Sequence, residues 1–269
     1  MTSDNLCLSD IYANLQPHAA DCSLYLHKSV TSTNTLAREL ASSGAKHATT
    51  IIADEQTAGK GRMGRAFYSP GGSGLYMSII LRPNEILASS LELLTVLAAV
   101  AVCEAIEELS PLTPQVKWVN DIVLSERKVG GISCETRIDP LCEERSWVIL
   151  GIGINVSTKE EVFPIELRSL VSSLYPGHDC PFTRSQLAAA IIKSVLHPKA
   201  ESTAALVASY RRRLMMLERR IEVYSSSERY EAVAKDVDAA GHLLVQKDSG
   251  ELCVLMAGEI SIKIVGEPK

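Results

Sequence analysis

The stretch Ala58–Arg65, AGKGRMGR, decides between two fold classes, because it has the spacing G-x-G-x-x-G and follows the strand-like run TTIIADE at 49–55. A dinucleotide-binding fingerprint needs its third glycine in the first turn of a helix. Gly64 is instead followed by RAFYSPGGSGLYMS, whose Pro70 and three glycines forbid a helix. The spacing of a P-loop is also absent. The stretch therefore does not indicate a doubly wound nucleotide-binding fold.

What remains is a loop in which three cations, Lys60, Arg62 and Arg65, alternate with glycines. Glycines let a backbone approach a ligand closely, and cations neutralise a phosphate. A flexible, solvated surface loop has the same composition. The loop taken alone leaves both interpretations open.

Strand-like runs lie next to one another along the chain. Alternating or β-branched residues predict strands at 22–30, 48–56 and 74–83, and SWVILGIGINV predicts another at 146–156. A hairpin is predicted around the turn Ser125–Lys128, between PQVKWVND and IVLSERKVGGISCE. Strands in adjacent runs, without regular β-α-β alternation, predict a mixed sheet.

Helices are predicted at Thr35–Gly44, Leu91–Leu109, Leu187–Leu196 and Ser202–Met216. Together with the strands they predict an α+β fold with helices mainly on one face of the sheet. From Arg219 the chain changes to short alternating segments separated by Ser, Asp and Gly turns.

The predicted organisation has three parts. Residues 1–22 form an N-terminal arm, either loose or a short helix, and contribute little to a functional site. Residues 23–217 form the main domain, and residues 218–269 form a small all-β barrel.

Composition excludes several classes of protein. The 269 residues carry a net charge of -5, so no broad basic face for nucleic acid is expected. Seven cysteines, without a C-x-x-C pair, predict reduced structural thiols in a cytoplasmic protein. The longest apolar run, Leu93–Cys103, is too short for a bilayer, and the first residues do not resemble a signal peptide.

Six motifs occur in a fixed order. They are TSTNT (31–35), DEQTAGKGRMGRAFYSP (54–70), GLYMSIILRP (74–83), KWVNDIVLSERKVGGISCE (117–135), LGIGINV (150–156) and GEISIK (258–263). In this order they resemble the biotin–protein ligases, or holocarboxylase synthetases, over about residues 23–269. The resemblance implies the biotin–lipoate ligase fold, a class II synthetase-like mixed sheet with a small C-terminal SH3-like barrel.

The resemblance also implies a two-step reaction. Family members join biotin and ATP into biotinyl-5'-adenylate, with magnesium, and then transfer biotin to one lysine of a carboxyl-carrier domain, of which that of acetyl-CoA carboxylase is the natural candidate. The first step brings together two anions, a carboxylate and the α-phosphate, so cations must neutralise both.

Two cations match the family's catalytic positions. Arg62 matches the central loop arginine, whose forked guanidinium suits two oxyanions. Lys128 in RKVGG matches the catalytic lysine, although by itself it would be interpreted as an exposed turn lysine. The following Gly130-Gly131 pair allows close packing beneath a ligand, and the same spacing is typical of a β-bulge.

A biotin-binding set follows from the same match. It comprises Ser32, Thr33, Asn34, Gln56, Gly59, Lys60, Gly61, Gly131 and Gly151. A ureido ring needs both donors and acceptors. Helix capping by Ser32 or Thr33 and a surface role for Gln56 are the alternatives, and Asn34 is expected to orient the loop more than it touches ligand. Lys60 stands where the family usually has an arginine, and Gly151 would let the biotin ring lie against its strand.

The nucleotide-binding set implied by the resemblance comprises Arg62, Arg65, Phe67, Lys117, Asn120, Asn155 and Lys263. Phe67 would stack on adenine or belong to the core. Asp121 is the candidate magnesium ligand, because this hard cation prefers oxygen. Val119 stands where the family usually has proline, which puts the rigidity of that loop in doubt, and Trp118 is as consistent with the core as with a ligand contact.

Two alternatives stay open. A lipoate–protein ligase or octanoyltransferase has the same architecture, and a catalytically silent biotin sensor would keep the pocket alone. Some family members carry a winged-helix repressor domain, but 22 residues before the first strand are too few for one. A monofunctional ligase without specific DNA binding or membrane contact is therefore expected, as a monomer or a homodimer.

Overall fold

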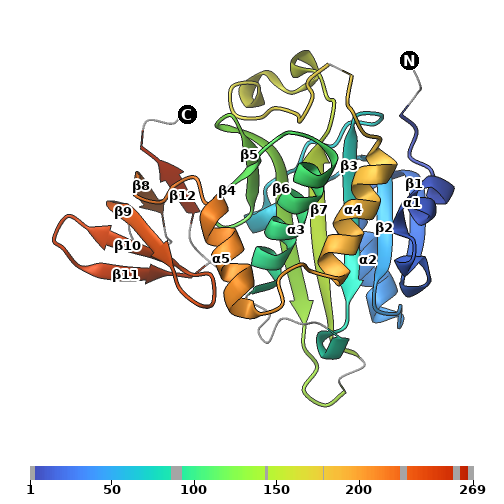
Figure 1. The fold of residues 1–269 in the computed structure, drawn as a ribbon, viewed down its shortest axis with the longest axis horizontal. Coiled ribbons are helices and arrows are strands. Elements are labelled where there is room, and N and C mark those ends of the chain that lie inside the picture. The colour runs from blue at the N-terminus through green and yellow to red at the C-terminus, as the bar shows by residue number, and fades with distance from the viewer. Residues whose placement is uncertain are drawn as a thin grey trace.

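The structure is a computed structural model that describes residues 4–85, 93–142, 145–177, 179–224, 229–256 and 261–265. A seven-stranded mixed sheet with helices on both faces forms its main body, and a five-stranded sheet lies at one side (Figure 1). The predicted α+β class is confirmed. None of the described helices is long and apolar enough to span a membrane.

The large sheet has the strand order β1-β2-β3-β7-β6-β5-β4. Its strands are β1 (Ser23–Val30), β2 (Thr49–Gln56), β3 (Gly74–Leu81), β4 (Gln115–Lys117), β5 (Asp121–Leu124), β6 (Arg127–Arg137) and β7 (Trp147–Asn155). Strands β1 and β2 are parallel, and every other neighbouring pair is antiparallel. The central strands β3 and β7 are almost entirely buried, which explains their continuous apolar sequence.

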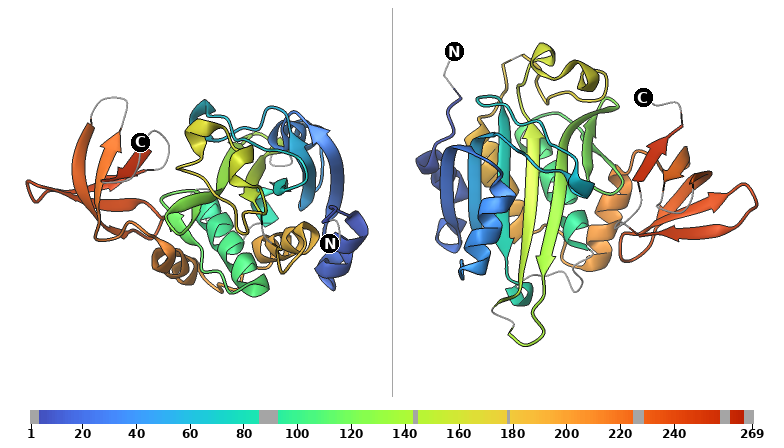
Figure 2. Two further views of the ribbon diagram at one scale, coloured as in Figure 1. Left: turned by 90° about the horizontal axis from the view of Figure 1, so that it is seen from above. Right: turned by 180° about the vertical axis from the view of Figure 1, so that it is seen from behind.

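Helices cover the two faces unequally. Helix α2 (Thr33–Ser42) lies alone on one face, where Ala37 and Ala41 pack against Ile51. Helices α3 (Leu94–Leu109) and α4 (Arg184–Leu196) cover the opposite face, with α1 (Leu8–Leu15) and α5 (Thr203–Arg213) beside them (Figure 2). Most helices therefore share one face, as predicted; residues 91–92 of the predicted long helix lie outside the described residues.

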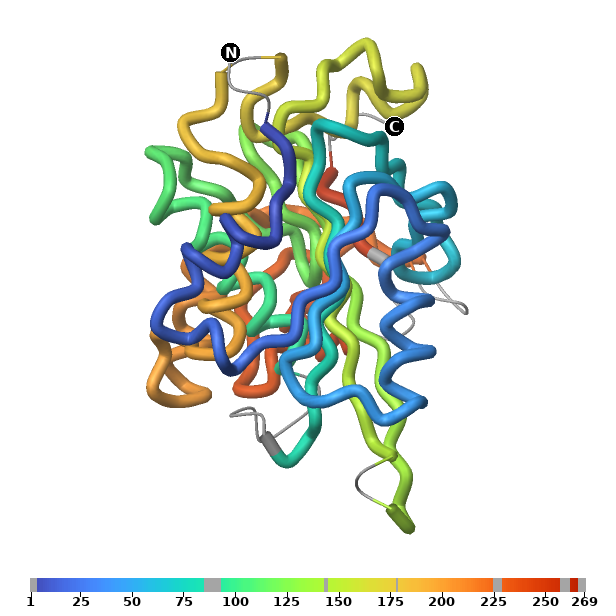
Figure 3. Tube along the Cα trace, turned by 90° about the vertical axis from the view of Figure 1, so that its right-hand side faces the viewer, coloured from blue at the N-terminus to red at the C-terminus, as the bar shows by residue number. Residues whose placement is uncertain are grey.

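The N-terminal arm is a short helix rather than a loose segment. Ile11 and Leu15 of α1 are fully buried, and α1 packs along α4 (Figure 3). A 3-10 turn, His18–Asp21, leads from the arm into β1. The arm is therefore part of the folded core.

The C-terminal sheet contains five antiparallel strands in the order β11-β10-β9-β8-β12. They are β8 (Arg220–Tyr224), β9 (Arg229–Val237), β10 (Leu243–Lys247), β11 (Leu252–Leu255) and β12 (Ser261–Ile264). Within the part of the chain that the structure describes, β11 and β12 do not pair, so no barrel is closed. The SH3-like barrel and the boundary at residue 218 stay predictions.

The predicted hairpin turn was too long. Only Ser125 and Glu126 form the turn, with positive φ angles of 49° and 64°, whereas Arg127 and Lys128 already belong to β6. The earlier segment is also divided, because β4 and β5 are separate strands joined by Trp118–Asn120. Lys128 is therefore a strand residue, held by a ladder rather than by a loop.

Candidate functional site

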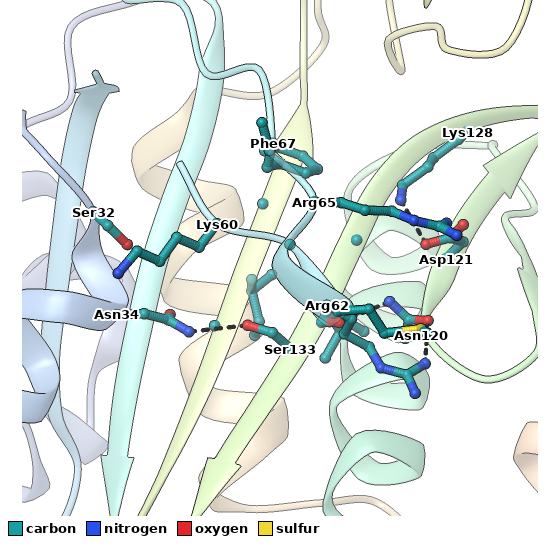
Figure 4. Close-up of a pocket in the computed structure, with 18 of the residues that line it drawn as sticks. Ser32, Asn34, Lys60, Arg62, Arg65, Phe67, Asn120, Asp121, Lys128 and Ser133 are labelled. Atoms are coloured by element: carbon teal, nitrogen blue, oxygen red, sulfur yellow. Dashed lines mark hydrogen bonds and ion pairs between the residues drawn. The ribbon is translucent and has the colours of Figure 1, made fainter. Parts of the chain in front are cut away.

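A cavity of about 230 Å³ opens on the face of the large sheet that carries α2. It brings together fifteen of the predicted site residues, namely Ser32, Thr33, Asn34, Gln56, Lys60, Gly61, Arg62, Arg65, Phe67, Lys117, Asn120, Asp121, Lys128, Gly131 and Gly151. Figure 4 shows Ser32, Asn34 and Lys60 at one side of this cavity and Arg62, Arg65 and Lys128 at the other.

Glycines interrupt the side-chain rows of the sheet beneath the cavity, and Asn34 and Phe67 lie over two of them, Gly151 and Gly153. Gly153 lies between Tyr76 and Gly131 in one cross-strand row, and Gly151 lies between Ser78 and Ser133 in the next. Cross-strand neighbours point to the same face, so each missing side chain leaves room above the central strands. The Gly131 position lies beneath Lys128 and Phe67, with an added Cβ only 3.3 Å from the lysine Nζ.

The stretch Ala58–Arg65 is one arm and the turn of a β-hairpin over the cavity. The Phe67 amide donates to the Gly59 carbonyl at 2.9 Å, and the Gly61 amide donates to the Arg65 carbonyl at 2.7 Å. Its tip is a 3-10 turn at Arg62–Gly64. No helix follows, as expected. Gly59 does not line the cavity, and its missing side chain permits close approach within the hairpin, because a Cβ there would lie 2.4 Å from the Phe67 carbonyl oxygen.

Gln56 joins two parts of the cavity wall by hydrogen bonds. Its Oε1 accepts hydrogen bonds from the Thr33 amide at 2.9 Å and the Thr33 hydroxyl at 3.1 Å, and its Nε2 donates to Ser69. Ser32 occupies the N-cap position of α2 but makes no side-chain capping bond, although it is buried. The capping interpretation of Ser32 is therefore wrong, and Gln56 ties α2 to the hairpin.

Asn34 lies across the Gly151 position. Its Nδ2 donates to Ser133 at 3.0 Å and to Glu135 at 2.8 Å, and its Oδ1 accepts from Ser78 at 2.6 Å. A Cβ on Gly151 would lie 2.2 Å from the Asn34 Oδ1. The space above Gly151 thus holds Asn34 itself, which agrees with an orienting role for Asn34 and differs from the expected direct contact between Gly151 and a ligand.

A β-bulge turns Lys128 toward the cavity. Ile122 pairs with Gly130 and Val123 pairs with Lys128, so Val129 is the extra residue of β6. In a regular strand, residues 128 and 131 would face opposite sides of the sheet; the bulge puts both on the cavity side. The Lys128 backbone also pairs with the segment at 170–172, which fixes its position from the other side.

The cationic end contains two polar pairs. Lys128 Nζ lies 2.6 Å from Asp121 Oδ1, and Arg62 Nη1 donates to Asn120 Oδ1 at 2.9 Å. Burial lowers the pKa of the Arg62 guanidinium, an effect that nearby Asp121 opposes, and an arginine in a protein keeps its charge regardless. The two cations converge from different elements, with Arg62 on the hairpin and Lys128 on β6.

A second cavity, of about 320 Å³, adjoins the first and shares Arg65, Phe67, Lys117, Asp121 and Lys128 with it. Asn155 lines only this second cavity. The Asn155 Nδ2 donates to the Ser172 carbonyl at 2.9 Å. Its Oδ1 is buried without a hydrogen-bond partner among the described residues. Such an acceptor is costly to bury and marks a position for a donor from a ligand.

The loop before β5 is held from two sides although it has Val119 rather than proline. The buried Tyr210 hydroxyl donates to the Val119 carbonyl at 2.9 Å. Trp118 Nε1 donates to the Gly241 carbonyl at 3.0 Å, and the Trp118 ring is buried while lining the cavity. Trp118 therefore belongs both to the core and to the cavity wall.

Lys263 does not line either cavity, because β12 presents the preceding residue, Ile262, to the first one. Lys263 pairs across the ladder with Glu222, whose pKa is lowered chiefly by hydrogen bonds from Tyr224 and Arg229. Its predicted role toward a nucleotide stays a prediction.

Sequence reasoning missed the polar row behind Asn34. Ser78, Ser133 and Glu135 all form hydrogen bonds with this amide. Arg38 donates from Nε at 3.2 Å and from Nη2 at 2.8 Å to one oxygen of Glu135, Oε2. The signal in the sequence was a serine at the centre of each of two apolar strands, where a hydroxyl must find a buried partner.

We expect Gly151→Ala to destabilise the protein by about 1–3 kcal/mol, since the new Cβ would overlap the Asn34 amide and the Ser133 hydroxyl. Urea-induced unfolding followed by circular dichroism measures the effect. Gly71→Ala is the matched control, because a Cβ there has its nearest neighbour at an ordinary 3.5 Å. Equal stability of the two variants would show that the site tolerates the extra methyl group.

Residues 26–155 match the model of the biotin/lipoate A/B protein ligase family. The bifunctional ligase/repressor BirA of Bacillus subtilis is 41% identical over 167 residues, which cover 62% of this chain and 50% of that protein. The biotin--[acetyl-CoA-carboxylase] ligase of Mycobacterium tuberculosis is 26% identical over 214 residues, or 78% of this chain and 77% of that protein.

A solved structure extends the likeness to both sheets. The biotin protein ligase from Aquifex aeolicus in complex with biotin and ATP superimposes with a TM-score of 0.75 and 26% identity, covering 90% of this chain and 99% of that one. The chain spans about half the length of the BirA proteins from the Bacillus strains that it matches.

Proposed function

We propose that the chain is an ATP-dependent biotin protein ligase, since residues 26–155 match the biotin/lipoate A/B protein ligase family and the chain is similar to proteins with that activity. In the first step the biotin carboxylate attacks the α-phosphate of ATP, forming biotinyl-5'-AMP and releasing pyrophosphate. In the second step the neutral amine of an acceptor lysine attacks the acyl carbon, and AMP leaves.

The observation that carries this proposal is the set of polar and cationic groups that one cavity brings together. Ser32 lies at one end, where Figure 4 also shows Lys60, and the hydrogen-bonded pair Thr33 and Gln56 lines the same cavity. Their hydroxyl and amide groups suit a ureido ring, which both donates and accepts hydrogen bonds. Arg62 and Lys128 lie at the other end, where the carboxylate and phosphate must meet. A purely acyl ligand would use none of these polar groups.

The second cavity suits the nucleotide. Phe67 stands between the two cavities and offers its ring to a base, and Arg65, Lys117 and Asn120 extend the polar wall toward phosphate. The orphaned Asn155 Oδ1 matches the need of an adenine amino group for an acceptor. The biotin carboxylate and the α-phosphate of ATP would then meet between Arg62 and Lys128, and Lys60 would add to the positive field.

Asp121 is the proposed residue for magnesium. It is the single carboxylate among the described residues that line the first cavity. One carboxylate fits a magnesium ion that takes its other ligands from water and from the phosphates of ATP. Bound there, the ion would supply positive charge to the triphosphate.

The acceptor that we propose is a lysine of a biotin carboxyl-carrier domain of acetyl-CoA carboxylase. The name of the Mycobacterium tuberculosis relative gives this carboxylase as its target. The test is incubation of a purified carrier domain with the protein, biotin, ATP and magnesium, followed by intact mass measurement. We expect one biotinyl group per carrier domain and none when the acceptor lysine is replaced by arginine. An unmodified wild-type carrier would overturn this assignment.

We expect Arg62→Gly to release biotinyl-adenylate about 10- to 100-fold faster than the unchanged protein. Arg62 would contact the adenylate through charged hydrogen bonds, each of which contributes about 1.5–3 kcal/mol. The readout is free adenylate in solution and biotinylation of unrelated protein lysines. Arg62→Lys keeps the charge without the forked guanidinium. Its rate of adenylate release should lie between that of Arg62→Gly and that of the unchanged protein.

Arg229→Ala is the control for this experiment, because that guanidinium pairs with Glu222 in the C-terminal sheet, outside both cavities. It should retain adenylate as the unchanged protein does. Full retention by Arg62→Gly would show that this arginine does not hold the intermediate.

A further inference from the structure

A cluster of potential metal ligands lies where the N-terminal arm meets the end of α4. One potential ligand atom from each of His18, Asp21 and His197 lies within 4.8 Å of the other two. None of the three residues lines the first cavity, and Asp21 and His197 border a separate surface hollow. The cluster is therefore distinct from the site of the proposed ligase reaction.

Local backbone structure creates this arrangement. His18 and Asp21 are the first and last residues of the 3-10 turn, and residues three apart in a 3-10 helix lie one above the other. His197 is the C-cap residue of α4. Packing of α1 along α4 brings these two elements together (Figure 3).

The distances indicate ligands around a shared ion rather than direct hydrogen bonds. Asp21 Oδ2 lies 3.7 Å from His18 Nδ1 and 3.6 Å from His197 Nε2. Hydrogen bonds from nitrogen to oxygen span about 2.7–3.2 Å. Tetrahedral zinc with bonds of about 2.0–2.2 Å separates its ligand atoms by about 3.3–3.5 Å, close to the two observed distances.

The chemistry of the donors defines the class of ion. Two imidazoles and one carboxylate suit zinc, nickel, cobalt or iron(II), whereas calcium and magnesium prefer oxygen ligands alone. The side chains of His18, His197 and Asp21 are 31%, 42% and 56% exposed, so an ion could enter and keep water at its open positions. The two imidazole rings lie next to each other, with centroids 3.9 Å apart and planes tilted by 31°.

We propose that His18, Asp21 and His197 bind a first-row divalent transition-metal ion such as Zn²⁺. The bound ion joins the 3-10 turn to the C-terminal end of α4. The other end of α4 is already tied to the arm, because Asp4 pairs with Arg184. The ion therefore gives the arm a second attachment to α4, at the opposite end of the helix from the Asp4–Arg184 pair.

The test is calorimetric titration of the tag-free, thiol-reduced protein with Zn²⁺ in the absence of nucleotide. The unchanged protein should bind one more equivalent of zinc than the double variant His18→Ala/His197→Ala, and zinc should raise its melting temperature more. Asp21→Asn should lower the affinity for that zinc ion by at least about tenfold. His27→Ala, a histidine of β1 outside the cluster, is the matched control.

Comparison with the double variant separates this site from the cysteines, which the variant retains. Circular dichroism of the zinc-free variant checks that it is folded. Equal zinc stoichiometry and affinity in the two proteins, or no zinc binding by the unchanged protein, would overturn the proposal.

Discussion

Replacing Lys128 with alanine should lower the rate of biotinyl-adenylate formation by about 10²- to 10³-fold, the usual effect of removing one preorganised group that stabilises developing charge. Lys128 is aligned for this task by the bulge at Val129 and by its 2.6 Å ion pair with Asp121. Single-turnover pyrophosphate release at saturating biotin and ATP measures the chemical step separately from binding.

Lys235→Ala is the matched control. Lys235 is 34% exposed and lies 2.7 Å from Glu218, whereas Lys128 is 33% exposed with a similar ion pair, but Lys235 belongs to β9 and lines neither cavity. Loss of activity in both variants would indicate a general structural effect. A folded Lys128→Ala protein that turns over like the unchanged chain would show that the charge-stabilising role is misassigned.

Arg184→Met should lower the free energy of unfolding by about 3–5 kcal/mol, because it removes one partner of a buried ionic network. The Arg184 side chain is 2% exposed and lies between Asp4, at 3.1 Å, and Asp54, at 2.6 Å. It also donates to the Gly74 carbonyl at 3.0 Å. Methionine leaves both carboxylates facing a site without their cation. Urea-induced unfolding followed by circular dichroism measures the difference.

Arg211→Met serves as the control for that loss. Arg211 also lies on a helix and pairs with a carboxylate, Asp236, at 2.7 Å, but its side chain is 55% exposed. The change should cost less than about 1 kcal/mol. If the two variants lose the same stability, burial of the Arg184 network does not contribute as proposed.

The large sheet was predictable because its strands carry clear local patterns. The β-branched run at 48–56 corresponds to β2, and the apolar run at 74–83 corresponds to β3, each within two residues. The ordered motifs also predicted the group of residues that meet in the first cavity, since strand ends and the hairpin converge on one face.

Non-local pairs could not be predicted in the same way. Arg184 stands in the first turn of α4, where a cation opposes the helix dipole, so local rules predict an exposed side chain. Its partners Asp4 and Asp54 are 180 and 130 residues away along the chain. No local pattern indicates that Arg184 forms ion pairs with both of these carboxylates.

The bulge at Val129 is a second feature that the sequence alone could not predict. The spacing RKVGG was consistent with a turn lysine, a bulge or a ligand-binding strand, and one extra residue changes which face a side chain takes. Only the register between β5 and β6 shows that Lys128 shares the cavity face with Gly131. The position of Asn34 above Gly151 likewise depends on contacts between segments far apart in sequence.

Pyrophosphate release by the purified protein with ATP and magnesium, measured separately with biotin, lipoate and octanoate, tests the proposed ligase activity directly. We expect release with biotin, dependent on ATP and magnesium, and no comparable release with the two acyl substrates. Absence of biotin-dependent release, together with activity on lipoate or octanoate, would contradict it.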